Sequence, residues 1–325
     1  MGLLTNGQLR SGPFAVCCFF AISGFLITHS WIRSKSSADF LMKRFLRIYP
    51  GFIAVTLLGV FLLAPFVSEH FGFGPRKLLM LPWWLLSLRQ VPMPSIFPNN
   101  PLPGALNGSL WSIPYEFKCY LAVMLIGSLG FFGQRVRVAL LLICVVVGCA
   151  VYPSIPNISS LENGPIEKVF GSVLAWCQVF PYFIAGMAFY LFRDRIPSST
   201  LLLVIAFFSF VVASAFPPAG LVVFPFAITY ALFWFAFHPK IPFKSWSRYG
   251  DFSYGTYLYA FPIQQLITMK MPGISPIMLF LISTPPSIIA GVFSWHVVEK
   301  HFLRLKNRLQ KQSRTESQLP ALEKA

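Results

Sequence analysis

Long apolar runs recur along the chain and alternate with short segments that hold most of the charged residues. Several runs reach about 20 residues, the length that an α-helix needs to cross the hydrocarbon core of a bilayer. The pattern therefore predicts an all-α fold, a polytopic transmembrane helix bundle of about nine spans. The predicted spans are 13–32, 51–68, 110–132, 138–153, 170–192, 200–216, 219–237, 252–270 and 274–298.

A further apolar piece, 78–88, is too short to span and carries Pro82 and two tryptophans, which predicts an interfacial or re-entrant segment. It lies in the longest predicted outer loop, 69–109, whose glycines and prolines indicate irregular backbone. The expected organisation is an outer-side N-terminal segment, a transmembrane domain and a basic cytosolic tail. These three parts cover residues 1–12, 13–303 and 304–325.

Composition supports a membrane protein, because 56% of the residues are hydrophobic and only 11% are charged. A soluble domain carries about 25% charged residues. The net charge of +16 would also suit a nucleic-acid-binding protein. We favour the positive-inside rule, because the basic residues lie in short loops between spans. Membrane lipid is thus an expected partner, and nucleic acid is not.

The lysines and arginines also predict orientation. If the loop 33–49 is placed inside and the spans alternate, 19 of the 26 lysines and arginines fall on the inner side. This predicts a multi-pass protein of the inner (cell) membrane with a cytosolic C-terminus. An odd number of spans then puts the N-terminus outside, although residues 1–12 do not resemble a signal peptide. The simplest expectation is an additional span that precedes the given sequence.

The cysteines all lie in apolar runs, and none forms a C-x-x-C pair, so they are expected to be small buried hydrophobic residues. Neither a disulfide framework nor a metal site is predicted. The cysteines are Cys17, Cys18, Cys119, Cys144, Cys149 and Cys177.

Glu116 is the first candidate for chemistry, because it stands near the start of an apolar run. A charge at the middle of a membrane costs about 2.5–3.5 kcal/mol or more, so such residues usually face partners inside the bundle and serve a function. Ser109, Ser112, Glu116 and Tyr120 have helical spacing, which predicts one polar face directed into the bundle.

The alternative for Glu116 is a structural ion pair, for instance with Arg44 or Lys118. Trp111 is either a platform for a sugar ring or a residue of the interfacial aromatic belt.

Arg44 and Arg47 are three residues apart on a predicted inner-side helix, so both guanidinium groups are expected on one face. Paired guanidinium groups bind phosphates through parallel hydrogen bonds. The alternative is anchoring to lipid headgroups.

His29 lies toward the inner end of the first span and is a candidate base or proton relay, or else a structural histidine. In the same span, Ser23 and Gly24 form a small pair that favours close helix packing. Tyr254 and its neighbours predict a bent, aromatic-lined helix, for which packing is the alternative to substrate binding. Near the end of the last span, Glu299 is expected to hold a charge near the inner surface.

Five motifs, taken in order, resemble those of the membrane acyltransferase family 3, the bacterial integral-membrane O-acyltransferases. They are FFAISGFLI, RFLRIYP, NGSLWSIPYEF, FSYGTYLYAFPI and VVEKHF. Each motif is weak alone, and the ordered set is specific. The resemblance covers the chain from about Gly12 to Arg304.

The resemblance implies transfer of an acyl group, most simply acetyl, from acetyl-CoA or another acyl-CoA to a sugar hydroxyl. The acceptor would be a surface polysaccharide, such as O-antigen or exopolysaccharide, or a lipid-linked glycan. The acyl-CoA is a co-substrate, and no permanently bound cofactor is implied. Arg44 and Arg47 match the arginine pair that serves the donor, and Glu116 matches the acidic position of the family. The candidate substrate-binding residues are Asn107, Ser109, Trp111 and Tyr254.

The sequence departs from the family at its start, since members open with a span that carries an arginine and the histidine expected to be the base. Three explanations remain: a longer native chain, an inactive relative, or His29 acting as the base. The alternative class is a non-catalytic transporter-like protein for a glycan or lipid. The inverted repeats that are common in transporters are not evident in this sequence.

Overall fold

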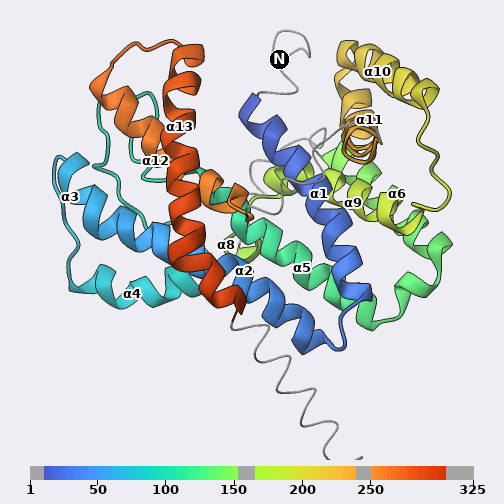
Figure 1. The fold of residues 1–325 in the computed structure, drawn as a ribbon, viewed down its shortest axis with the longest axis horizontal. Coiled ribbons are helices and arrows are strands. Elements are labelled where there is room, and N and C mark those ends of the chain that lie inside the picture. Colours follow the sequence, from blue (N-terminus) through green and yellow to red (C-terminus); the bar gives the residue numbers. More distant parts are fainter. Residues whose placement is uncertain (1–10, 153–164, 239–249, 305–325) are drawn as a thin grey trace, which may run out of the picture. The chain divides into compact units, whose positions relative to one another are not determined.

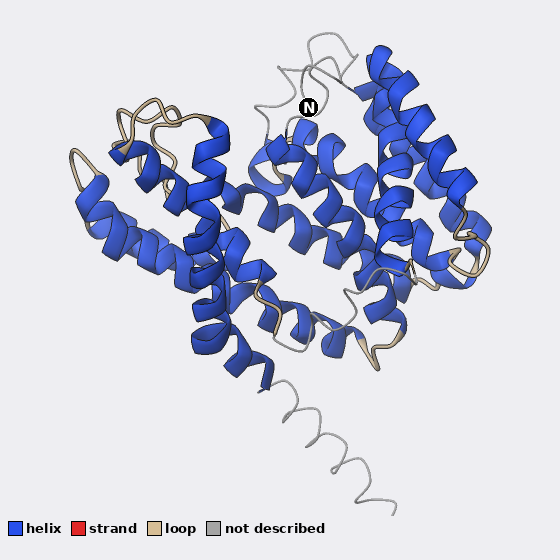
Figure 2. Cartoon of the chain, turned by 45° about the horizontal axis from the view of Figure 1, so that its top comes forward, coloured by secondary structure: helices blue, strands red, loops and turns tan. Residues whose placement is uncertain are grey.

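The computed structural model describes residues 11–152, 165–238 and 250–304. Throughout these ranges the regular structure is helical, apart from one isolated bridge between Ser68 and Ile96 (Figure 2). The all-α prediction is confirmed for this part of the chain. The chain folds into two compact units, which we describe separately. The first unit comprises residues 1–40 and 115–245, and the second comprises residues 41–114 and 246–325.

The first unit contains α1 and the helices of the middle of the chain (Figure 1). Its centre is the pair α1–α9, against which α6 and α11 also pack, while α10 packs on α11. The bounds are α1 Ser11–Ile32, α5 Ile113–Ser128, the 3-10 turn Phe131–Gly133, α6 Arg135–Val151, α8 Pro165–Phe170, α9 Val173–Leu191, α10 Thr200–Ala215 and α11 Pro217–Phe237. The first two residues of α5 belong to the second unit.

Two glycines allow α1 and α9 to touch through their backbones. A Cβ atom on Gly24 would overlap the carbonyl oxygen of Phe183, and one on Gly186 would overlap that of Ala21. Neither position can accept a side chain unless the helices separate. The close helix approach predicted at Ser23-Gly24 is therefore confirmed.

The second unit contains a long helical stretch, a compact loop region and a C-terminal helix pair. In it α12 and α13 lie side by side (Figure 1). The bounds are α2 Ser37–Leu57, the π-helix η1 Leu58–Leu63, α3 Ala64–Val67, α4 Pro75–Leu86, the 3-10 helix η2 Gly108–Ser112, α12 Ser253–Lys270, α13 Pro276–Ser294 and the π-helix η6 Trp295–Glu299.

The second predicted span began too late. Hydropathy marks only its apolar part, from residue 51, whereas the helix starts at Ser37 and passes through Pro50 without ending. Membrane helices tolerate an internal proline where other groups satisfy the freed backbone. Arg44 and Arg47 lie within α2, so their predicted placement on a helix is confirmed.

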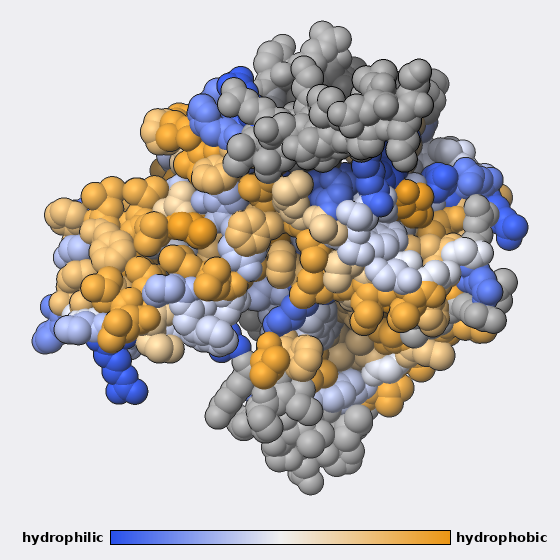
Figure 3. Space-filling model, turned by 90° about the horizontal axis from the view of Figure 1, so that it is seen from below, coloured by the Kyte–Doolittle hydropathy of each residue, from blue (hydrophilic) through white to orange (hydrophobic). Residues whose placement is uncertain are grey.

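Within the described ranges, five helical stretches are long and apolar enough to cross a membrane. They are 12–32, 37–67, 173–191, 219–237 and 276–304, and shorter apolar helices cover 138–151 and 200–215. Figure 3 shows hydrophobic side chains over much of the face it draws; Phe66, for example, is 81% exposed. The protein is a multi-pass membrane protein, and the number nine stays a prediction.

The loop region 69–109 is more ordered than its glycines and prolines indicated. The helix α4 occupies the place of the predicted interfacial segment. Beyond α4 the chain buries Ile96 and Phe97 completely against Val60 and Ala64 of the long helical stretch. The predicted irregular backbone is confirmed for most of this loop. Its apolar residues nevertheless belong to a hydrophobic core that they share with the preceding helical stretch.

Cys17, Cys119 and Cys177 are buried as predicted, whereas Cys144 is exposed on α6.

Candidate functional site

Arg47 is the centre of an ionic cluster in the second unit. Its Nη2 atom lies 2.7 Å from Oδ2 of Asp251, and its Nη1 atom lies 3.4 Å from Oε2 of Glu299. The guanidinium carbon is 5.4 Å from the centre of the Tyr254 ring, a cation–π distance. Helices α2 and α12, the turn before α12 and the π-helix η6 thus converge on a single guanidinium group.

Glu299 is the buried member of this cluster, with a side chain that is 1% exposed. The Ser294 hydroxyl donates to its Oε1 atom at 3.1 Å. The lack of a side chain on Gly255 leaves room for the carboxylate, since a Cβ there would lie 3.1 Å from Oε1. A carboxylate so deeply buried needs a cation and hydrogen-bond donors, and Arg47 and Ser294 supply them. Glu299, which was expected to hold a charge near the inner surface, is therefore buried in an ion pair with Arg47.

Asp251 is the exposed member, with a side chain that is 56% exposed. The Ser253 hydroxyl donates to its Oδ1 atom at 2.7 Å. The preceding Gly250 has φ of 120° and packs against the indole of Trp295, so this turn requires glycine. Sequence reasoning did not select Asp251, and its only local signal was its place just before an apolar helix.

Tyr254, predicted to bind substrate, fixes the same region of α2. Its hydroxyl donates to the carbonyl oxygen of Ile48 at 2.9 Å, and its ring packs where a Cβ on Gly51 would stand. The packing interpretation is thus supported, and substrate binding stays a prediction. Arg44 lies one helical turn before Arg47 on α2 and is half-buried.

Asn107 and Ser109 fasten η2 to α12. The Asn107 side chain is buried, donates to the carbonyl oxygen of Leu258 at 2.8 Å, and accepts from the Ser109 amide at 3.1 Å as the cap of η2. The Tyr257 hydroxyl donates to the Ser109 carbonyl oxygen at 2.6 Å and lies 2.8 Å from the Ser112 hydroxyl. These contacts give Asn107 a structural role, and Trp111 lies half-buried in the same short helix.

Glu116 belongs to the first unit and is 6% exposed. Its Oε1 atom accepts hydrogen bonds from the Tyr120 hydroxyl, one turn along α5, and from the Ser23 hydroxyl of α1 at 3.5 Å. The neighbouring Lys118 directs its Nζ atom to the carbonyl oxygen of Phe170 at 2.8 Å. The prediction that Glu116 faces the interior of the protein is confirmed.

The predicted single polar face is wrong in its first half. Ser109 and Ser112 lie in the 3-10 helix η2, and the α-helix begins only at Ile113. Pro114 explains this start, because proline favours the first turn of a helix. The regular helical spacing therefore holds for Glu116 and Tyr120 alone.

His29 lies near the end of α1 in the first unit and is half-buried. Its ring centre is 5.3 Å from that of Tyr190 on α9, and the Arg193 guanidinium covers the same tyrosine at 4.4 Å. Ser23, which contacts Glu116, is six residues earlier on α1, or about 9 Å along the helix axis. His29 and Glu116 thus occupy different levels of the first unit.

Comparison with known proteins assigns this chain to a class of enzymes. The model of a family described as an acyltransferase domain matches residues 2–296. The O-acetyl transferase of Shigella phage Sf6 is 31% identical over an alignment of 315 positions that covers 91% of this chain and 86% of the relative. Nodulation protein 10 of Rhizobium leguminosarum bv. viciae is 26% identical over an alignment of 326 positions that covers 93% of this chain and 84% of the relative. No solved structure matches the chain.

These matches define an acyltransferase enzyme embedded in a membrane. The chain belongs to the membrane acyltransferase family 3.

Proposed function

We propose that this protein is an integral-membrane O-acyltransferase that moves an acetyl or other acyl group from acyl-CoA to a sugar hydroxyl. The acceptor is a surface polysaccharide or a lipid-linked glycan. The names of the relatives support transfer to oxygen and a role beyond housekeeping metabolism, since one is an O-acetyl transferase and the other a nodulation protein. The polysaccharide acceptor rests on the resemblance of the five sequence motifs.

The observation that supports a binding site for the acyl donor is that two carboxylates hold the guanidinium group of Arg47 in place. Coenzyme A is rich in phosphates, and a guanidinium offers five N–H donors in a planar fork. Glu299 holds one side of that fork in the interior, while Asp251 holds the other at the surface. A donor phosphate can replace the exposed Asp251 contact without disturbing the buried one. Arg44, one turn away, adds a second positive charge on α2.

The transfer itself needs a base for the sugar hydroxyl. The hydroxyl oxygen attacks the thioester carbonyl carbon and loses its proton to the base, and the carbon–sulfur bond breaks. Coenzyme A leaves as a thiol after it takes up a proton. We assign His29 as the candidate base in the given sequence. Glu116 is held by two hydroxyl donors, so it suits the orientation of a hydroxyl or a base.

The proposal is tested with purified protein in lipid nanodiscs, radiolabelled acetyl-CoA, and polysaccharide from the native host. Covalent label in the glycan is expected. Arg47→Gln should raise the KM for acetyl-CoA by tenfold or more, by loss of a charge-assisted contact. Arg76→Gln, a change of the same charge at an exposed position of α4, is the matched control. A protein that moved glycan without labelling it would instead be a transporter, and an unchanged KM would refute the donor site.

We also propose an inner-membrane location with a cytosolic C-terminus, which the distribution of lysine and arginine supports. A reporter that is active only in the cytosol, fused after Ala325, should be active. An active periplasmic reporter at the same position would reverse the orientation.

A further inference from the structure

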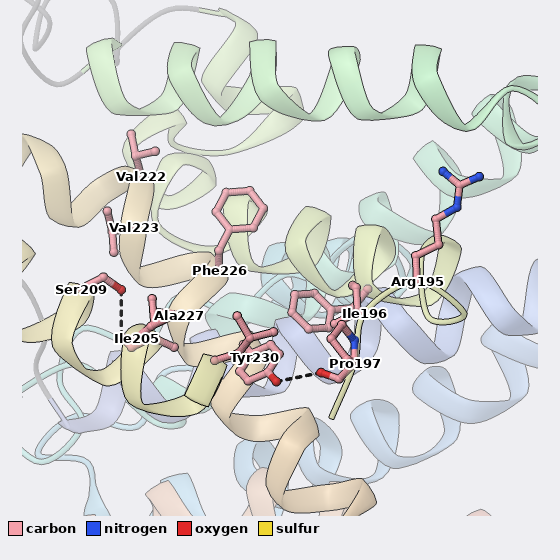
Figure 4. A pocket seen from close by; sticks show the side chains of 13 residues that line it. Arg195, Ile196, Pro197, Ile205, Ser209, Val222, Val223, Phe226, Ala227 and Tyr230 are labelled. Carbon is pink, nitrogen blue, oxygen red and sulfur yellow. Dashed lines mark hydrogen bonds between the residues drawn. The ribbon is translucent and has the colours of Figure 1, made fainter. Parts of the chain in front are cut away.

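Two cavities adjoin in the first unit. The candidate base His29 lies near the first of them, because His29 and the cavity residue Arg193 both contact Tyr190. One, of about 400 Å³, is lined mainly by aromatic rings of α1, α9 and α11, and we call it the aromatic cavity. The other, of about 560 Å³, lies between α10 and α11 and is lined mainly by aliphatic side chains (Figure 4); we call it the aliphatic cavity. They share Phe189, Ile196, Pro197 and Tyr230, so they are adjacent and have a wall in common.

The wall between the cavities is held by hydrogen bonds. The Tyr230 hydroxyl donates to the carbonyl oxygen of Pro197 at 2.8 Å and accepts from the Ser199 amide at 3.0 Å (Figure 4 shows the first contact). These bonds tie the turn between α9 and α10 to the middle of α11. The space is therefore pre-formed, because its wall is fixed by main-chain contacts and not by mobile side chains alone.

Each cavity has an arginine among its lining residues. Arg193 lines the aromatic cavity, stacks over Tyr190 and donates to the carbonyl oxygen of that residue at 2.9 Å. Arg195 lines the aliphatic cavity and lies at one end of it in Figure 4. Within the described part of the chain Arg195 has no ion-pair partner, and Arg193 has only a surface contact of 3.8 Å with Asp194. An apolar space with positive charge at one end is complementary to an anionic amphiphile.

The position of α10 indicates that these cavities border the lipid. Of the described helices, α11 is its main packing partner, and its other face is apolar and open; Phe207, for example, is 68% exposed. In a membrane protein such a face lies against lipid chains. On the orientation predicted from charge, the segment 193–199 is at the cytosolic leaflet, where anionic lipids meet basic pockets between helices.

We infer that the aromatic and aliphatic cavities bind an anionic phospholipid. Its acyl chains occupy the apolar space on either side of Tyr230, and its phosphate lies between Arg193 and Arg195. This inference does not depend on the proposed acyl transfer, although Arg193 contacts the same tyrosine, Tyr190, as the candidate base His29. A zwitterionic phospholipid could fill the same space but would gain less from the two guanidinium groups.

Native mass spectrometry of the full chain, purified in detergent, tests the site with added phosphatidylglycerol and phosphatidylcholine. Wild-type protein should retain phosphatidylglycerol preferentially. Arg193→Gln/Arg195→Gln should reduce that retention by about 30-fold, the product of two arginine contacts, and should remove the preference. Arg76→Gln/Lys77→Gln, which removes the same charge from α4, should change neither value.

A second variant tests the apolar part of the site. Ala206→Phe places a ring in the aliphatic cavity and should lower retention of both phospholipids at least fivefold. The single change Arg195→Gln, at an exposed side chain, carries the charge test if the double variant does not fold. Equal retention by wild type and the arginine variants would overturn the inference. Equal loss of retention in the α4 control would also overturn it, because general attraction by positive charge would then explain the binding. Competition by glycerophosphoglycerol as strong as by the intact lipid would overturn it as well, because a simple anion site would explain that result.

Discussion

The ionic cluster around Arg47 predicts that the longer of its two ion pairs contributes more to stability. Arg47 lies 2.7 Å from Asp251 and 3.4 Å from Glu299, so distance alone would favour the first pair. Asp251 is 56% exposed, however, and exposed pairs contribute only about 0–1 kcal/mol. Glu299 is 1% exposed, and removal of the partner of a buried charge costs about 3–5 kcal/mol.

Arg47→Ala should therefore destabilise the protein by about 3–5 kcal/mol, because the Ser294 hydroxyl would then be the remaining partner of the Glu299 carboxylate among the described residues. Asp251→Asn should cost less than about 1 kcal/mol. Arg47→Lys should rescue Arg47→Ala only in part, because an ammonium group cannot face two carboxylates as a planar fork does.

The measurement is a pair of double-mutant cycles, Arg47 with Glu299 and Arg47 with Asp251, from equilibrium unfolding in mixed micelles followed by tryptophan fluorescence. The coupling free energy with Glu299 should exceed that with Asp251 by at least about 1 kcal/mol. A larger coupling with Asp251 would refute the reasoning. Added salt should weaken only the coupling with Asp251, because buried pairs are screened much less.

Four further predictions concern the first unit and η2. Gly24→Ala should destabilise the protein by about 1–3 kcal/mol or more through overpacking, whereas Gly148→Ala, with open space at its Cβ, should be nearly neutral in the same unfolding measurement; equal effects would contradict backbone contact of α1 with α9. Asn107→Ala should cost about 1–2 kcal/mol through loss of a helix cap and a buried hydrogen bond, and a neutral change would reject the structural role. Glu116→Gln should lower kcat for glycan labelling by 10-fold or more with little change in KM for acetyl-CoA, and His29→Ala should abolish labelling by the given sequence; retained turnover in either variant would remove that residue from the chemistry.

Local apolar patterning was sufficient to predict most helices in this fold. The predicted segment 200–216 corresponds to α10 at Thr200–Ala215, and 252–270 corresponds to α12 at Ser253–Lys270. The pattern works because lipid-facing helices must remain apolar over their whole length. It failed for the start of α2. Hydropathy predicted a start at residue 51, whereas a basic, amphipathic stretch extends the helix back to Ser37.

The partners of the site residues could not be predicted in the same way. Arg47 and Glu299 are 252 residues apart in the sequence, and spacing along a helix carries no information about such a pair. Arg47 was correctly predicted to lie on a helix, and Glu299 was expected to hold a charge near the inner surface. Neither Glu299 nor Asp251 was predicted to be a partner of Arg47. Ser109 and Ser112 show the opposite error, because helical spacing was assumed where Pro114 delays the α-helix and a 3-10 helix forms.

The interactions between segments also explain why motifs that are weak alone are specific as an ordered set. In the second unit, RFLRIYP supplies Arg47, FSYGTYLYAFPI supplies Tyr254, and VVEKHF supplies Glu299, so three distant segments build one ionic cluster. In the first unit, FFAISGFLI supplies Ser23 and NGSLWSIPYEF supplies Glu116, which share a hydrogen bond. The residues of one motif are constrained by the residues of another that they contact, because a buried charge requires a hydrogen-bond donor or a countercharge from another segment. A change of Glu299 in VVEKHF should consequently displace the guanidinium group of Arg47 on α2. On the donor site that we propose for Arg47, it should also raise the KM for the acyl donor in the glycan-labelling assay.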